Sequence, residues 1–223
     1  MATTTSSSAN TPPSPQSATK NILDTLHHFG HSKWGFVIYR TTYTPASDTA
    51  WARFTQLVTA QSNAEMSDPQ VPAEVAAACE WTFVSDPETL DGASRDDLRR
   101  RFRAWAADAE ISENPGGVAR DRYGFRAQRY VYFVLVDEEV LRSIGDGDGG
   151  GGLEGGWVKF VRCEEGEEEV GETEGEEGEG EEEEGWMHIS ADMLGPGWYD
   201  VMGNVPEEGW FVFWRPPPEV VKY

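Results

Sequence analysis

The sequence predicts a single α+β domain built on a mixed β-sheet. Residues 34–43 contain an unbroken run of β-forming apolar residues from Phe36 to Ile38, and such a run is typical of a strand covered on both faces. Two later segments place apolar residues at helical spacing, and further strand patterns follow them. This order of patterns predicts two main helices packed on one face of the sheet, with ferredoxin-like βαβ elements.

The charge of the chain is unevenly distributed. The 223 residues carry a net charge of −22, but 14 of the 40 acidic residues lie between 164 and 184, and without them the net charge is −8. A length of this order is expected for one domain with attachments. Because phosphate binding depends on Lys and Arg, the acidic balance argues against nucleic acid as the main partner.

Composition sets the expected boundaries of the domain, which we place at residues 21–215. Residues 1–20 are rich in Ser, Thr and Pro and predict a disordered tail, since they have little apolar surface to bury. A Gly-rich linker is expected at 145–156, a disordered Glu/Gly-rich insert at 163–185, and a tail at 216–223. With no secretory signal and no apolar run of about 18 residues, a cytoplasmic or nuclear location is expected.

The first half of the chain predicts alternating helices and strands. A short helix is expected at 21–31, before the strand at 34–43. Asp48 is a good N-cap for an amphipathic helix at 49–61, whose apolar stripe includes Trp51 and Phe54.

A second strand and a second long helix follow. The strand is expected at 80–85. Ser94 and Asp97 then form an acidic variant of the capping box, which predicts a helix that ends near Pro115. The apolar run at 129–136 predicts a central strand, followed by a short helix that begins at Asp137.

The last third of the chain predicts a hairpin with a very long loop. Residues 157–162 alternate in polarity, and 186–189 resume a strand pattern on the other side of the acidic insert. Loop closure costs rise only slowly with length, so this insert is tolerable between paired strands. Residues 198–202 are expected to dock on the core, and 209–214 to form a final strand that ends at the prolines 216–218.

The cysteine and histidine pattern predicts no metal or cofactor. Cys79 and Cys163 are too few for a disulfide framework or a Cys-only zinc site, so both are expected to be free thiols. His27 and His31 have the i, i+4 spacing that places two side chains on one helix face. No HExxH pattern accompanies them.

Three residues are the strongest candidates for a buried polar site. Arg40 lies in the first strand, where an unpaired charge is costly to bury, and Asp137 lies at the end of a central strand, where α/β sites often form. The two predict an ion pair that is either internal or able to bind a substrate carboxylate, and we favour the internal pair. His188, beside Ser190 on a predicted strand, is the candidate titratable group for an enzyme.

Basic residues predict a separate interaction face. The candidates follow the second long helix and the loop after it: Arg99, Arg100, Arg101, Arg103, Arg120, Arg122, Arg126 and Arg129. The hypothesis is that the Glu-rich insert competes for this face or contacts a basic partner protein. Such surface attraction weakens with salt.

With these segments placed, the chain resembles a group of functionally uncharacterised proteins of filamentous (ascomycete) fungi. The motifs are KWGFVIYRTTY, AWARF, ETLDGAS, RRRFRAW and YVYFVLVDEEVL, which together cover about residues 33–144. The resemblance implies an intracellular fungal protein and brings no activity with it.

Three functions remain open at this point. A protein-interaction module with an acidic insert ranks first, because it explains the segregation of charge. An enzyme or small-ligand binder with an aromatic-lined pocket ranks second, since the many aromatic residues are able to line a pocket or a core. Single-stranded nucleic-acid binding through residues 120–130, where arginines and aromatics alternate, ranks third.

Overall fold

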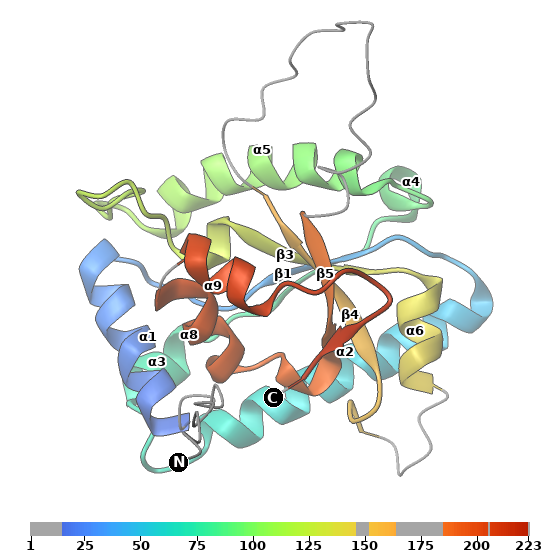
Figure 1. Cartoon of the computed structure of the whole chain (residues 1–223), viewed down its shortest axis with the longest axis horizontal. Coiled ribbons are helices and arrows are strands. Elements are labelled where there is room, and N and C mark those ends of the chain that lie inside the picture. Colours follow the sequence, from blue (N-terminus) through green and yellow to red (C-terminus); the bar gives the residue numbers. More distant parts are fainter. Residues whose placement is uncertain (1–14, 146–151, 164–184, 205, 223) are drawn as a thin grey trace, which may run out of the picture.

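A computed structural model describes residues 15–145, 152–163, 185–204 and 206–222 (Figure 1). Its core is one mixed sheet in the strand order β2-β1-β3-β4-β5-β6. The strands are β1 Val37–Arg40, β2 Thr82–Val84, β3 Tyr132–Val136, β4 Trp157–Arg162, β5 Trp186–Ser190 and β6 Val220–Val221. Strands β2, β1 and β3 are parallel, β4 is antiparallel to both its neighbours, and β6 is parallel to β5. The predicted α+β class and mixed sheet are therefore confirmed.

Helices surround this sheet. They are α1 Pro15–Phe29, α2 Pro45–Met66, α3 Ala73–Ala78, α4 Pro87–Leu90, α5 Arg95–Glu113, α6 Glu138–Gly145, α8 Pro196–Asn204 and α9 Pro206–Phe213, with 3-10 turns η1 Gln128–Tyr130 and η2 Ala191–Met193. None of the helices in the described residues combines the length and the apolar character that a bilayer span requires.

The two long helices cover opposite faces of the sheet, so the prediction that both pack on one face is wrong. In Figure 1, α5 runs along one side of the sheet, while α1, α2 and α8 lie on the other. Phe36 and Ile38 face the core beneath α2, whereas Val37 and Tyr39 face the core beneath α5. Right-handed crossovers explain this arrangement, because the chain moves from β1 to β2 in one direction and back past β1 to β3 in the other.

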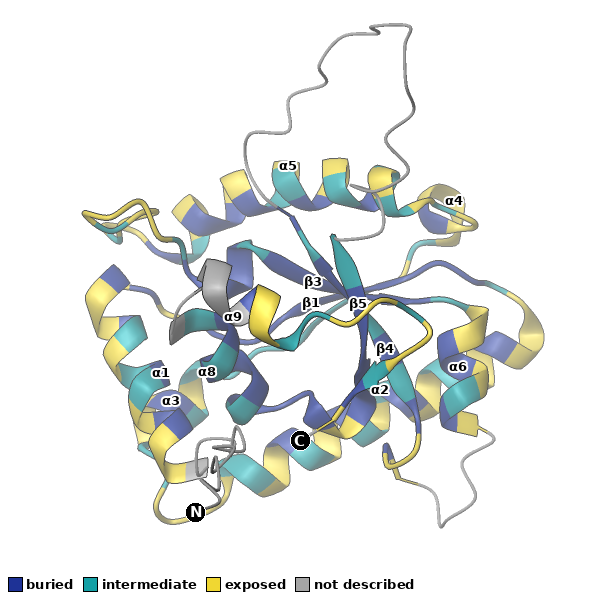
Figure 2. Ribbon diagram, viewed as in Figure 1, coloured by how far each residue is buried: buried dark blue, intermediate teal, exposed yellow. Residues whose placement is uncertain are grey.

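Burial follows the alternation of side chains in the central strands. Every residue of β1 and β3 is buried, while the outward surface of α5 is exposed (Figure 2). The rings of Phe102 on α5 and Phe133 on β3 lie 5.1 Å apart, and on the other face the rings of Phe36, just before β1, and Phe160 on β4 are also 5.1 Å apart. The unbroken apolar run of the first strand is thus explained by two cores, one on each face.

Helix α1 begins inside the segment predicted to be a disordered tail. It starts at Pro15, and Ala18, Ile22 and Leu26 form a buried stripe on the side that meets α8. The tail prediction is therefore wrong for residues 15–20, since the composition of these residues hid the small apolar side chain that continues the stripe. Residues 1–14 lie outside the described part of the chain.

Both long helices begin with a capping box. At α5 the hydroxyl of Ser94 accepts a hydrogen bond from the Asp97 N–H, as predicted. Helix α2 begins earlier than predicted, because Thr44 is its N-cap and Pro45 occupies the first turn, where a proline is tolerated.

The end of the chain departs most from the prediction. The hairpin of β4 and β5 is confirmed, but 209–214 is not a strand: α9 covers Pro206–Phe213. Trp210 is buried and stacks on Tyr132, with ring centroids 5.9 Å apart. The β-forming composition of this segment is overridden by that packing. Residues 216–223 are not a simple tail either, since Val220 and Val221 form β6.

The two predicted flexible segments lie mostly outside the described residues. The structure omits 146–151 of the Gly-rich linker and 164–184 of the acidic insert. At their margins the chain is packed: Leu153 is buried in the core, and the N–H of the buried Cys163 donates to the Val131 carbonyl. Packed residues therefore lie within the bounds predicted for both segments.

Glu65 on α2 is half-buried, and its buried carboxyl oxygen Oε2 has no hydrogen-bond partner among the described residues. That oxygen lies against Gly195, at the start of α8, while the Gln61 amide donates to the other oxygen. Burial raises the pKa of Glu65 to about 7, and the Gln61 hydrogen bond only partly opposes this shift.

We expect Glu65→Gln to stabilise the protein above neutral pH. Between the unfolded pKa and about 7 the folded state keeps a proton that the unfolded chain has lost, so stability falls as pH rises through this window. Chemical denaturation at about pH 8.5 should show a gain of about 1 to 2 kcal/mol after allowance for solvent screening. The gain should vanish near pH 4.5, and the control Asp108→Asn on exposed helix surface should change little. A gain of equal size at both pH values would contradict the assignment.

Candidate functional site: a groove at the edge of the sheet

Strand β2 forms one edge of the sheet, and among the described residues only β1 pairs with it. The N–H groups of Glu80 and Thr82 donate to β1-side carbonyls. Because successive backbone groups of a strand point to opposite sides, the N–H and C=O groups of Trp81 and Phe83 point away from the sheet. An edge of this kind is a template for a further strand.

A groove runs beside this edge, between β2 and α2. Two adjoining cavities of about 270 and 480 Å³ share Thr59, Asn63 and Phe83 in their walls. The helix side is lined by Thr55, Thr59, Asn63 and Met66, and the strand side by Cys79, Trp81 and Phe83. We call this hollow the α2–β2 groove. Both cavities are open to solvent.

Ring contacts fix the aromatic wall of the groove. Trp81 packs edge-on against Trp34, and its indole N–H donates to the Ser62 hydroxyl on α2, 3.0 Å away. Phe83 packs edge-on against Trp51, with ring centroids 5.9 Å apart. The wall is therefore held from behind by core residues, while all residues of β2 stay partly exposed.

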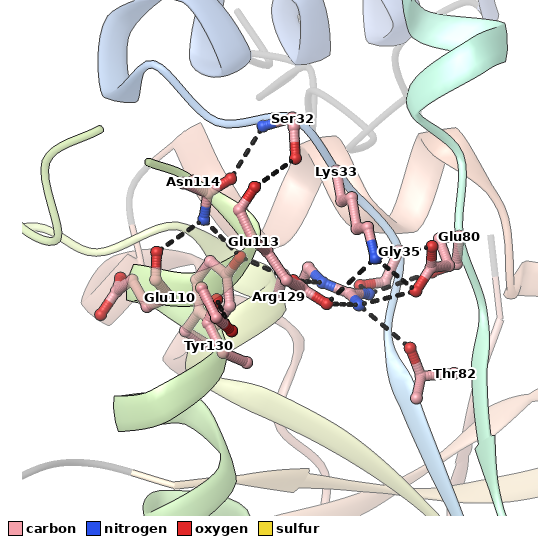
Figure 3. Close-up of polar contacts among 12 residues, drawn as sticks. Ser32, Lys33, Gly35, Glu80, Thr82, Glu110, Glu113, Asn114, Arg129 and Tyr130 are labelled. Atoms are coloured by element: carbon pink, nitrogen blue, oxygen red, sulfur yellow. Dashed lines mark hydrogen bonds and ion pairs between the residues drawn. The ribbon is translucent and has the colours of Figure 1, made fainter. Parts of the chain in front are cut away.

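A buried arginine anchors the edge strand from the opposite face of the sheet (Figure 3). Arg129, in η1, is fully buried. Its guanidinium donates to the Thr82 hydroxyl at 3.0 Å, the Glu80 carbonyl at 3.1 Å and the Gly35 carbonyl at 3.3 Å. One side chain thus links η1 to the starts of β1 and β2.

Glu113, at the end of α5, compensates the charge of Arg129. Its two oxygens accept from Arg129 at 2.8 and 2.9 Å, and it also accepts from the Tyr130 hydroxyl and from Lys33. Burial would raise the pKa of Glu113, but the hydrogen bonds and charges of Arg129 and Lys33 hold it below its usual value. The network is a positioning device, because every charge in it has a protein partner.

Gly35 permits the close approach of the two strands at this anchor. It has a φ of +110°, and a Cβ placed there would lie 2.4 Å from the Glu80 carbonyl oxygen. Only glycine fits this combination of conformation and space.

The crevice where open α/β sheets usually bind ligands is bridged by the protein itself. Consecutive crossovers lie on opposite faces at β1 and β2, so their carboxyl ends define the switch point. There the Tyr43 hydroxyl donates to the Arg40 carbonyl and accepts from the Asp86 N–H, each at 2.8 Å. The Gly92 N–H donates to the Thr41 carbonyl.

The predicted ion pair between Arg40 and Asp137 does not form. Arg40 is buried as expected, but its guanidinium pairs with Asp48 and donates to the Ser47 hydroxyl at the start of α2. Asp137 accepts from Lys159 and from the Val140 N–H at the start of α6. The two residues end neighbouring parallel strands, but each is drawn to the helix that follows its own strand.

His188 is buried between tryptophans. Its ring centroid lies 3.9 Å from that of Trp157 and 5.2 Å from that of Trp186. Burial lowers the pKa of His188, and the nearby Pro218 carbonyl only partly opposes the shift. The lowered pKa is thus explained by packing, and the groove lies at the other edge of the sheet.

The predicted basic face is divided between exposed and buried residues. Arg129 is fully buried and the side chain of Arg126 is 8% exposed and paired with Glu110, so neither belongs to an open surface. The others belong to α5 or to the following loop: Arg99, Arg100, Arg101, Arg103, Arg120 and Arg122. Arg99 and Arg100 pair with aspartates one turn earlier, which reduces their local positive charge.

The cysteines and the paired histidines have structural partners. Cys79 and Cys163 are free thiols, and the Cys79 sulfur lies 3.2 Å from the Ser62 hydroxyl in the groove. Burial raises the pKa of Cys79, which keeps it in the less nucleophilic thiol form. His27 pairs with Glu74, and His31 contacts the Val118 carbonyl. Within the described residues, no cluster of three or more potential metal ligands occurs.

Comparison with known proteins yields no match to a family model, to a curated protein or to a solved structure. The assignment of function therefore depends on the geometry of the molecule.

Sequence reasoning identified the strand that contains Trp81 and Phe83 but missed its position at the edge. A signal was present, because this strand is short and is ended by Asp86-Pro87, and edge strands are often kept short. Its neighbour in space, α2, was predicted correctly as a helix. Nothing in the local pattern of either segment indicates that a groove separates them.

Proposed function

We propose that this protein is an interaction module that binds an extended peptide as an additional strand on β2. The carrying observation is the coincidence of an open strand edge with a groove along the same edge. Main-chain hydrogen bonds from a partner supply affinity in this mode, and pockets for its alternate side chains supply specificity.

The geometry favours a peptide over a small molecule or a substrate. Small-ligand sites bury most of their ligand in a concave pocket, often at the switch point of the sheet. Here the switch point is bridged by Tyr43, and the hollow beside β2 is an open groove. A polypeptide matches both of its features, because it carries backbone donors for the edge and side chains for the groove.

The anchor on the far side of the sheet supports the same proposal. A strand that receives a partner must keep its outward N–H and C=O groups in place without a neighbour on that side. Arg129 holds the residues on both sides of Trp81, through the backbone carbonyl of Glu80 and the side-chain hydroxyl of Thr82. This preorganisation lowers the entropy cost of adding a strand.

Selection of a random peptide library displayed on phage against the full chain tests the proposal. Enriched peptides should carry apolar residues at alternate positions. Asn63→Trp, which fills the groove, should weaken their binding by more than about tenfold. The matched control Ala64→Trp adds the same side chain at the next exposed position, outside the groove, and should leave binding unchanged. Absence of enrichment, or equal binding to both variants, would refute the proposal.

A second pair of variants tests the strand addition itself. Phe83→Pro removes the outward-facing N–H, whereas Phe83→Ala removes the ring but keeps that donor. Selected peptides should bind the Pro variant several times more weakly than the Ala variant. Equal affinities would show that the peptide contacts the groove without pairing to the edge.

A further inference from the structure

The distribution of charge around the α2–β2 groove specifies the partner more closely, and this step rests on the proposed function. We propose that the bound peptide is cationic on both flanks, with Lys or Arg on either side of a short segment of alternating apolar residues.

Acidic side chains lie at both ends of the groove. Asp68 follows Met66, the last helix residue of the groove wall, by two positions. At the other end, Asp86 and Glu88 follow β2 directly. Asp68 accepts from the Gln70 N–H, and Asp86 accepts from the Glu88 N–H and the Thr89 hydroxyl. These donors are uncharged, so the carboxylates keep their attraction for an incoming cation.

Cations also lie near the groove. Arg101 lies close to Asp86, and its guanidinium donates to the uncharged Thr89 carbonyl, so its positive charge offsets part of the negative charge at that end. The Glu80 carboxylate pairs with Lys33 and with Arg129. The middle of the groove is therefore close to neutral, while its ends carry the carboxylates of Asp68, Asp86 and Glu88.

The spacing of these features fits a peptide of about nine residues. The helix wall from Thr55 to Met66 is about 16 Å long at 1.5 Å per residue. An extended chain covers that length with about five residues at 3.3 Å each. Two further residues at each end then reach the acidic side chains.

The charge of the whole chain favours the same partner. The net charge of −22 attracts a cationic peptide before contact and raises its association rate. It also disfavours a second copy of this chain as the occupant, because two such copies repel one another.

Three fluorescent nonapeptides test the inference on the full chain. They share the centre Val-Thr-Val-Thr-Val and differ in their flanks, which are two Lys, two Ser or two Glu at each end. Binding is measured by fluorescence anisotropy in about 50 mM and about 500 mM salt. At low salt the Lys-flanked peptide should bind about tenfold more tightly than the Ser-flanked one, and the Glu-flanked one most weakly. The ratio should approach one at high salt.

Two pairs of variants assign the binding to the groove. Attraction of Lys to the acidic insert would survive Asn63→Trp, whereas groove binding is lost in that variant and kept in Ala64→Trp. Glu88→Lys should reduce the preference for Lys flanks by several-fold. Glu138→Lys makes the same change in the exposed first turn of α6 and should leave that preference unchanged.

The outcomes separate the two proposals. If the Lys- and Ser-flanked peptides bind equally and Asn63→Trp abolishes the binding of both, the inference of a cationic peptide is wrong, but the groove is supported as the binding site. If the Lys-flanked peptide binds Asn63→Trp and Ala64→Trp equally, the groove is not its site and the inference is also wrong. If none of the three peptides binds, the cationic inference is overturned, and the library selection decides the groove separately.

Discussion

Arg129→Met is expected to lower the free energy of unfolding by about 3 to 5 kcal/mol. The substitution keeps much of the side-chain volume but leaves the Glu113 carboxylate, which is 14% exposed, without its two-point partner. Loss of one member of a buried pair has a cost of this order. It also removes the bonds to the Glu80 carbonyl and the Thr82 hydroxyl. Thermal denaturation should show a loss of roughly 10 °C or more.

Arg142→Met is the matched control for this prediction. Arg142 is exposed and pairs with Glu138 one turn away on α6, so its loss should cost less than about 0.5 kcal/mol. The double variant Arg129→Met/Glu113→Gln should recover part of the stability, because the uncompensated charge is then absent. If Arg129→Met and the control Arg142→Met have the same melting temperature, the buried network does not hold the edge strand.

Gly35→Ala is expected to cost about 3 kcal/mol or more, or to prevent accumulation of soluble protein. The added methyl would lie 2.4 Å from the Glu80 carbonyl oxygen, which is backbone and unable to rotate away. The residue would also keep a φ of +110°, which strains any residue with a side chain. Equilibrium denaturation in urea, or the soluble yield if folding fails, measures this loss.

Gly92→Ala separates conformational strain from the clash. Gly92 has a φ of +67°, but nothing lies within 4 Å of the added carbon. Gly92→Ala should therefore lower the free energy of unfolding by about 1 kcal/mol. Equal losses for the two variants would mean that β1 and β2 separate easily at Gly35, and that the edge strand is less firmly placed than its contacts indicate.

Patterns within single segments predicted much of this fold. Capping at Ser94, the helical stripe at Trp51 and Phe54, and the hairpin around the acidic insert all follow from local chemistry and are confirmed. The class of the fold follows from their order. These features depend on residues that are close together in sequence or, for the hairpin, on two segments that each have a strand pattern and pair with one another.

The features that the sequence did not predict depend on contacts between residues that are far apart in the chain. The reversal of strand order that puts α5 opposite α2 arises from β3 pairing with β1 rather than with β2. Arg129 reads as one more arginine in a basic loop, although the end of α5 surrounds it with Glu113 and makes it part of the core. Arg40 failed as a partner for Asp137 because Asp48 lies closer along the chain.

The sequence did not predict the α2–β2 groove for the same reason. Trp81 and Phe83 have a pattern that suits core or edge equally well. Only the position of β2 at the end of the sheet leaves its outward backbone groups unpaired among the described residues and its side chains partly exposed.

The other end of the sheet closes differently, and under the proposed function this affects how many partners one molecule would hold. Strand β6 contributes two residues, and the run Pro216–Pro218 before it has no N–H groups to offer another strand. The strand addition proposed for β2 therefore has no equivalent edge at β6. A domain that adds a partner strand only at β2 would hold one partner, and its complexes would not extend into a continuous intermolecular sheet.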